Sequence, residues 1–207
     1  NQMARQLRHR LELKENIDLA REVQQSLLPQ KGLKIDGLDI SGATMYCDET
    51  GGDYFDILKS DKDKDKIGVV VGDVVGHGVG AALLMTTIRA LVRSSFQQSG
   101  PLEDRMNDVN RLLFQDTAPA SNFVTLFYLE LDQAAKLMRW VRAGHDPALV
   151  INCRTREITE LTGEGVALGA DLDWSFSCNE LLLSEDPQVI LICSDGVFEA
   201  TNESGES

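Results

Sequence analysis

The chain has 207 residues, of which 43% are hydrophobic and 26% charged, as expected for a globular domain with a sizeable core. Its 33 acidic and 20 basic side chains give a formal charge of −13, which argues against nucleic acid or an anionic membrane as the main partner. A phosphorylated substrate would also be repelled unless bound cations reverse the local field. An acidic enzyme of phosphates is therefore expected to be a metal enzyme.

The cysteines and the hydropathy of the chain predict a reduced, cytoplasmic setting. The four cysteines are widely separated and form no Cys-x-x-Cys pair, which is typical of structural thiols in a cytoplasmic protein. They are Cys47, Cys153, Cys178 and Cys193. No signal peptide is visible, and no apolar stretch approaches the roughly 20 residues that span a bilayer. We therefore expect no membrane insertion in this segment, and we expect a sensor domain upstream of it.

Residues 3–28 carry no Gly or Pro, and Pro29 follows them, which predicts a helix that ends before the proline. One apolar stripe follows 4-3-4-3 spacing, and a second lies out of phase with it. The first comprises Leu13, Ile17, Ala20, Gln24 and Leu27, and the second Met3, Leu7 and Leu11. The helix either docks on the following domain or pairs two protomers as a coiled coil, and its narrow seam and dense charges favour a homodimer. We divide the chain into a helical linker, 1–29, and a domain, 30–207.

The domain alternates short strands with two helices. Strands are expected at Leu38–Cys47 and near Leu58, with a solvated hairpin tip at Ser60–Lys66, and a buried strand at Ile67–Val71. Apolar residues at helical spacing predict helices over 83–97 and 102–115, and six further short strands follow them. Strands outside and two helices in the middle imply an α+β sandwich with largely antiparallel sheets.

Three acidic turns stand out against this background. Asp53 follows a Gly-Gly pair and opens a strand, whereas Asp73 and Asp195 each end an apolar strand and precede a glycine turn. Taken singly, each is ordinary turn chemistry. Together, carboxylates on rigid strand ends suit hard cations such as Mg²⁺ or Mn²⁺. The widely separated His77 and His145 argue against zinc, which prefers clusters of His or Cys.

Six blocks in order resemble the bacterial PPM-type serine/threonine phosphatases, in the branch similar to SpoIIE and RsbU. The blocks are EVQQSLLP at 22–29, GGDYFD at 51–56, GDVVGHG at 72–78 with AALLM at 81–85, NFVTL at 122–126, AGHDP at 143–147 and SDGVFEA at 194–200. The resemblance implies an α-β-β-α sandwich, in which two antiparallel sheets pack face to face with helices outside. It also implies two Mn²⁺ or Mg²⁺ ions between the sheets, which activate a water for in-line attack on phosphorus.

The same resemblance assigns the site residues. Asp73 falls on the bridging metal ligand, the Val74 carbonyl on a further ligand, and Asp53 and Asp195 on the other metal aspartates. Supporting positions within the same motifs are Gly52, Asp56, Gly76, His145 and Gly196.

The match departs from the family at two places. His77, a candidate general acid, comes four residues after Asp73, whereas eukaryotic members place a histidine directly after an Asp-Gly pair. The alternative for His77 is a turn histidine on the groove wall. The alternative for His145 is a structural residue of a hairpin. The chain also stops at Ser207 before the family's last metal aspartate, so we expect the C-terminal end of the fold to be missing.

Three functions remain compatible with these motifs. The first is dephosphorylation of serine or threonine on a regulatory protein, which the resemblance identifies as an anti-sigma-factor antagonist in partner-switching signalling. The second is a non-catalytic interaction or dimerisation module. The third is a metal-dependent hydrolase of small phosphate compounds. Retention of Asp53, Asp73 and Asp195 favours the enzyme.

Overall fold

The structure is a computed structural model that describes residues 2–35, 37–45, 50–60, 62–120 and 122–197. In chain order its elements are α1 (Gln2–Leu27), β1 (Leu33–Ile35), β2 (Leu38–Ile40), β3 (Tyr54–Lys59), β4 (Lys66–Val74), α2 (Gly78–Phe96), α3 (Leu102–Thr117), the 3-10 helix η1 (Ala118–Ala120), β5 (Val124–Asp132), β6 (Leu137–Ala143), β7 (Ala148–Asn152), β8 (Ile158–Leu161), β9 (Asn179–Leu182), β10 (Gln188–Leu191) and the 3-10 helix η2 (Asp195–Val197). The predicted strand at 38–47 is shorter in the structure, and Cys47 lies outside the described residues.

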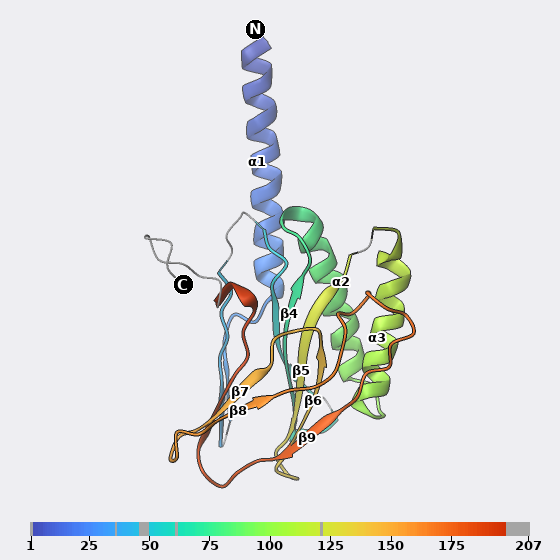
Figure 1. The fold of residues 1–207 in the computed structure, drawn as a ribbon. Helices are drawn as coiled ribbons and strands as arrows, with labels where there is room; N and C mark the ends of the chain where they lie inside the picture. Colours follow the sequence, from blue (N-terminus) through green and yellow to red (C-terminus); the bar gives the residue numbers. More distant parts are fainter. Residues whose placement is uncertain (1, 36, 46–49, 61, 121, 198–207) are drawn as a thin grey trace.

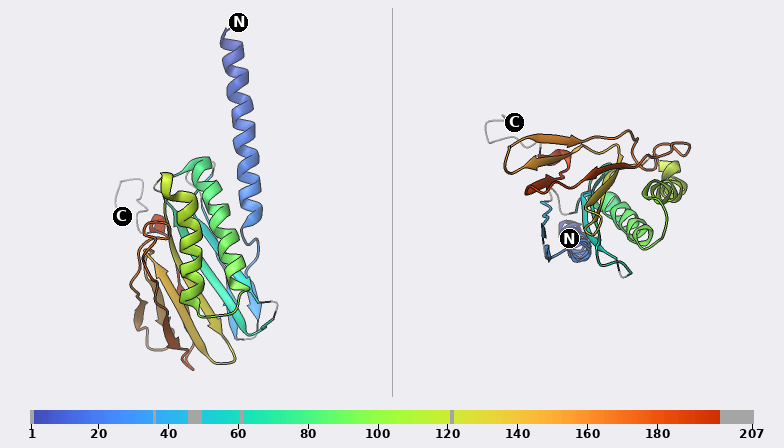
Figure 2. Two further views of the ribbon diagram at one scale, coloured as in Figure 1. Left: turned by 90° about the vertical axis from the view of Figure 1, so that its right-hand side faces the viewer. Right: turned by 90° about the horizontal axis from the view of Figure 1, so that it is seen from below.

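α1 is the predicted N-terminal helix, and its two halves have different surroundings. Residues 2–16 are exposed, and this half projects away from the sheets (Figures 1 and 2). In the second half Ile17 and Ala20 are half-buried, and Gln24 is buried. Part of the predicted stripe therefore docks on the chain's own domain, as the first of the two interpretations expected.

The larger sheet has five antiparallel strands in the order β3-β4-β5-β6-β9. Its centre is the pairing of β4 with β5, which extends without interruption from Lys66↔Asp132 to Val74↔Val124. Side chains alternate between the two faces of a strand. Val70 and Val74 of β4 therefore join one core cluster, and Ile67 joins the other.

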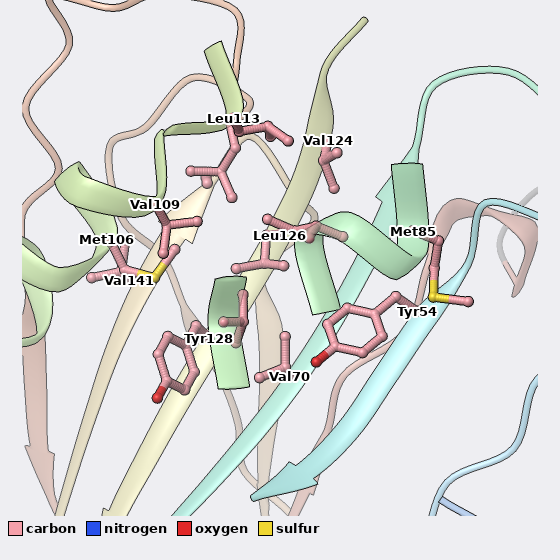
Figure 3. Packing of buried hydrophobic residues seen from close by; sticks show 14 of the residues in the cluster. Tyr54, Val70, Met85, Met106, Val109, Leu113, Val124, Leu126, Tyr128 and Val141 are labelled. Carbon is pink, nitrogen blue, oxygen red and sulfur yellow. The ribbon is translucent and has the colours of Figure 1, made fainter. Parts of the chain in front are cut away.

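α2 and α3 cover one face of this sheet, where Met85, Met106 and Leu113 meet the strands (Figures 2 and 3). By length and composition alone α2 is apolar enough to cross a membrane, the one such helix in the described part of the chain. The expectation that no apolar stretch approaches the length of a membrane span was therefore wrong, because α2 has both the length and the apolar composition. In the fold, however, α2 buries Met85, Ile88 and Val92, as a core helix does.

The second sheet has three antiparallel strands in the order β10-β7-β8 and packs on the other face of the larger sheet (Figures 1 and 2). Phe127, Leu129 and Trp140 from the larger sheet meet Val150 and Leu161 from the smaller one. The predicted α+β sandwich of two antiparallel sheets is confirmed. Within the described ranges, helices cover the larger sheet, while Ile158, Val189 and Leu191 on the smaller one are exposed.

Candidate metal centre

Asp73 is the next-to-last residue of β4 and lies on the face that meets the second sheet. Its neighbours Gly72 and Val74 are buried on the helix side, while Asp73 itself is half-buried and pairs across the ladder with Thr125. The sequence places it there because Val69, Val70 and Val71 form an apolar strand that fixes the register before the carboxylate. A short, rigid strand end therefore presents this carboxylate between the sheets.

Gly52 leaves room beside the oxygens of Asp73 and Val74. A Cβ on Gly52 would lie 2.5 Å from the Val74 carbonyl oxygen and 3.3 Å from Asp73 Oδ1. Any side chain at position 52 would thus occupy the space next to two oxygen atoms that the sequence predicts as metal ligands. The glycine keeps this space open to a small ligand.

Asp53 and Asp195 lie in the electrostatic field of Asp73. Burial raises the pKa of Asp73 to about 6, and the negative charges of Asp53 and Asp195 contribute to that increase. Burial also raises the pKa of Asp53, partly offset by a hydrogen bond from Ser194 and reinforced by the charge of Asp195. The turns at 53, 73 and 195, far apart in sequence, thus come together at one end of the sandwich.

The carboxylates are neighbours but do not form a closed set of ligands. No group of three or more His, Cys, Asp or Glu side chains within the described ranges is close enough to hold a metal ion. The donors are nevertheless of the right kind for Mg²⁺ or Mn²⁺: carboxylates and the main-chain carbonyl of Val74, which Gly52 approaches closely. Burial is the main cause of the raised pKa of Asp73, and the repulsion from Asp53 and Asp195 that adds to it is what a divalent cation would relieve. The residues present therefore fit a divalent cation.

His145 supports the backbone at Asp73 rather than pointing a charge at it. It is buried in the turn between β6 and β7, with Nδ1 2.9 Å from Thr125 Oγ1. Thr125 Oγ1 in turn donates a long hydrogen bond, 3.5 Å, to the Asp73 carbonyl. Burial lowers the pKa of His145, opposed by the charge of Asp146 and by the backbone of Cys193, so the neutral ring is favoured.

The ring of His145 lies against the backbone of Cys193, yet its buried Nε2 makes no hydrogen bond of acceptable geometry to any described residue. Thr125 is the residue that sequence reasoning missed. It stands within the quoted NFVTL block, opposite Asp73 in the ladder.

His77, Gly76 and Gly196 lie at the surface around these carboxylates. His77 is exposed and precedes α2 in an extended conformation, without a side-chain capping hydrogen bond. Gly76 has φ of 90°, which only glycine adopts without strain, so it sets the turn between β4 and α2. Asp195 and Gly196 form the exposed 3-10 helix η2. An exposed imidazole at this turn is accessible to a substrate, whereas the buried His145 is not.

Asp56 is on the opposite side of the larger sheet. It is fully buried against α2, where Arg93 donates two hydrogen bonds to it, from Nε at 2.6 Å and from Nη2 at 2.8 Å. The Tyr54 hydroxyl and the Ile57 amide also donate to its oxygens, each at 3.0 Å. The structure therefore does not bring Asp56 together with Asp73. Instead, Asp56 holds α2 against the sheet through Arg93.

Gln24 connects α1 to the loop before Asp53. Its Nε2 donates to the Gly51 carbonyl at 2.6 Å, and its Oε1 accepts from the Gly51 amide at 3.3 Å. This explains why Gln24 is buried in an otherwise exposed helix. This contact could not be predicted from the sequence, because Gln24 occupies a position in the apolar stripe.

Comparison with known proteins agrees with this geometry. RsbU of Bacillus subtilis, named a phosphoserine phosphatase, is 29% identical over 194 residues, which cover 94% of this chain and 56% of RsbU. RsbP of the same organism, also named a phosphoserine phosphatase, is 28% identical over 93% of this chain and 47% of its own length. The chain therefore spans about half the length of these relatives.

Among solved structures, the SiaA-PP2C domain of Pseudomonas aeruginosa superposes with a TM-score of 0.72, at 19% identity, over 96% of this chain and 78% of that one. The sandwich is thus the PP2C-type phosphatase fold. The family model described as stage II sporulation protein E (SpoIIE) matches residues 63–207. The chain belongs to the SpoIIE family, the bacterial PPM-type phosphatases that include the RsbU branch.

Proposed function

We propose that this domain hydrolyses phosphoserine or phosphothreonine on a regulatory protein, with Mn²⁺ or Mg²⁺ bound at Asp53, Asp73, the Val74 carbonyl and Asp195. The observation that carries the proposal is the electrostatic coupling of the three carboxylates beside the space at Gly52. Membership of the SpoIIE family supports the same reaction class.

Bound divalent cations supply two things to this chemistry: they neutralise the phosphoryl oxygens and they lower the pKa of water. The residues of the chain do the rest. Asp73 must be deprotonated to hold a cation, which its pKa of about 6 permits at neutral pH. Thr125, held by His145, donates to the main-chain carbonyl of Asp73 and so supports the backbone at this position. His77 stands at the surface, where it can protonate a departing serine oxygen.

The names of the relatives and the exposure of the site support a protein as the substrate. RsbU and RsbP are named phosphoserine phosphatases, and the similarity to RsbU covers 94% of this chain. Asp195 and His77 are exposed, so a phosphorylated side chain on a folded protein can approach them. We therefore favour a phosphorylated antagonist of an anti-sigma factor over a small phosphate compound as the substrate.

Phosphate release from a phosphoserine protein tests the proposal. Release should require Mn²⁺ or Mg²⁺, stop on addition of a chelator, and fall by more than about 100-fold in Asp73→Asn, because loss of a direct ligand exceeds the usual effect of an outer-shell change. Asp108→Asn on the surface of α3 removes the same charge and should leave release unchanged. Release from a small phosphate ester alone would instead support a small-molecule hydrolase. Metal binding without any release would support a binding module.

We also propose that α1 pairs with a second copy of the chain. The support is its exposed N-terminal half, in which Met3, Leu7 and Leu11 remain in solvent, and the low stability of single short helices in water. Leu11→Asp should shift the sedimentation coefficient toward the monomer, and Glu12→Gln is the matched surface control. Ile17 is less suitable for this test because it is half-buried against its own domain. Unchanged sedimentation of Leu11→Asp would rule out this pairing.

The setting of the domain is proposed on similar grounds. Cys153, Cys178 and Cys193 are free thiols, which suits the reducing cytoplasm. The separation into a linker, 1–29, and a phosphatase domain, 30–207, with a sensor upstream, remains our proposal, although Gln24 and Leu28 already pack with the domain. Limited proteolysis that removes α1 up to residue 16 and leaves the remainder intact would support this boundary.

A further inference from the structure

A cavity of about 640 Å³ lies at the β3 edge of the larger sheet, away from Asp73. The end of α1, the segment around Lys31, strand β3 and helix α2 form its walls. Its floor includes Asp56, which faces α2, whereas Asp73 faces the second sheet. We call it the junction cavity, and its volume is in the range of small-molecule sites.

The junction cavity is cationic in a strongly acidic chain. Among the described residues that line it are Lys31, Lys59, Arg89 and Arg93, with Asp56 as the single acid, which leaves an excess of three positive charges within this set. The whole chain carries −13. This charge therefore makes the cavity a local attractor for anions within a surface that otherwise repels them.

Asp56 cannot satisfy all of these cations. Arg93 engages both of its oxygens, and Tyr54 and Ile57 donate to them as well. Arg89 Nε lies 3.9 Å from Asp56 Oδ2, which is beyond hydrogen-bond distance.

Arg89 Nε is therefore a donor without a hydrogen-bonded acceptor among the described residues, although it lies within ion-pair distance of Asp56. The Arg89 side chain is only 18% exposed, and its Nε is fully buried with no hydrogen-bond partner in the described part of the chain. A buried guanidinium donor without an acceptor is costly, because desolvation is not offset by a hydrogen bond. The partly exposed Arg89 side chain lines the cavity, so an oxygen-bearing ligand there would supply a further acceptor to its guanidinium.

We propose that the junction cavity binds a small anion that presents phosphate or carboxylate oxygens. Arg89 is the main contact, and Lys31 and Lys59 at the exposed rim add charge. Such a ligand touches the end of α1, β3 and α2 at once, so its binding stabilises the docked position of α1. The proposal does not depend on phosphatase activity, because no residue of the cavity belongs to the carboxylate cluster at Asp73.

The test uses inorganic phosphate and citrate as probes on protein freed of metal by a chelator, at fixed ionic strength. Calorimetric titration and thermal unfolding should show saturable binding and a rising melting temperature for at least one probe. Phosphate without citrate would indicate a phosphate-bearing ligand, and citrate without phosphate a carboxylate. Arg89→Gln should weaken binding by about tenfold or more, the value of one charge-assisted hydrogen bond.

Three controls make the outcome decisive. Arg111→Gln removes an equal charge from the surface of α3 and should bind the probe as the parent chain does. Asp73→Asn should also bind it unchanged, which separates this cavity from the candidate metal centre. If Arg89→Gln does not fold, the double variant Lys31→Gln, Lys59→Gln tests the same charge from the exposed rim. Absence of saturable binding, or equal binding by Arg89→Gln, would overturn the proposal.

Discussion

Asp56 and Asp73 occupy neighbouring strands of one sheet, yet the protein treats their charges in opposite ways. Asp56 faces the helices and accepts hydrogen bonds from Arg93, Tyr54 and the Ile57 amide. Asp73 faces the second sheet, and its charged neighbours are the acids Asp53 and Asp195. One carboxylate is neutralised by the fold, and the other is left with a pKa raised to about 6.

The difference teaches how to separate a structural carboxylate from a ligand-binding one. Burial alone does not distinguish them, because Asp56 is the more buried of the two. The sign of the surrounding charges does. A carboxylate among cations holds elements together, while carboxylates gathered beside an open space require a cation from outside.

Closing the space at the acidic side should have the largest effect. In Gly52→Ala the new Cβ would lie 2.5 Å from the Val74 carbonyl oxygen, closer than a carbon atom can approach without a shift of the backbone. We expect the affinity for Mn²⁺ to fall by about 10- to 100-fold. Calorimetric titration measures it. Gly80→Ala in α2, where a Cβ meets nothing within 4 Å, is the control and should bind Mn²⁺ as before.

Removing the structural carboxylate should reduce stability instead. Asp56→Asn leaves Arg93 and Arg89 beside a neutral amide, and we expect the free energy of unfolding to fall by about 2–3 kcal/mol, below the full value for a buried pair because Arg93 is partly solvated. Urea denaturation followed by circular dichroism measures this loss. An unchanged midpoint would show that the pair contributes nothing to holding α2.

In metal-free protein, the pH dependence of the free energy of unfolding should report the raised pKa of Asp73. Asp73 ionises near 3.8 in the unfolded chain and near 6 in the folded one, so between these values the folded state binds more protons. The free energy of unfolding therefore falls as pH rises through this window, and Asp73→Asn removes that part of the slope. Urea titrations of both proteins at pH 4.5 to 7.5 test it: a stability difference that does not change with pH would contradict the raised pKa.

The contact between α1 and the Gly51 loop should have the smallest effect. Gln24→Ala removes two hydrogen bonds and should lower the free energy of unfolding by about 1–2 kcal/mol. Hydrogen exchange of the Gly51 amide should accelerate, because that amide loses its acceptor. Gln25→Ala, one residue further along on the exposed face, is the matched control. Equal protection of Gly51 in both variants would show that Gln24 does not hold the loop.

Much of this fold could be predicted from sequence because its signals are local. The apolar run before Asp73, the helix after Gly80 and the glycine turns each report their own element, and β4 and α2 follow them closely. The face of the sheet on which a side chain lies was harder to predict. Asp56 stands three residues after Asp53 in one motif, and only the ladder of β3 with β4 shows that it turns toward α2.

The remaining contacts depend on residues distant in sequence. Arg93 is 37 positions from Asp56, and Gln24 is 27 positions from Gly51. Neither partner differs in type from an ordinary surface residue, so no local pattern marks it. The closeness of the acidic turns at 53, 73 and 195 was expected from the resemblance, but the ligand roles of these residues remain predictions.

The pairing of β4 with β5 also has a consequence for the order of folding. Asp73 meets Thr125 across 52 residues, a segment that includes both α2 and α3. Such a long loop must close before these strands can pair, and closure carries an entropic cost that local hairpins such as β3 with β4 avoid. The β3–β4 hairpin alone brings Asp53 near Asp73, whereas Thr125 reaches Asp73 only after this long loop has closed, so the complete site forms after the hairpin. Metal-binding capacity should accordingly appear late in refolding, together with protection of the Val75 amide, which bonds to the Phe123 carbonyl.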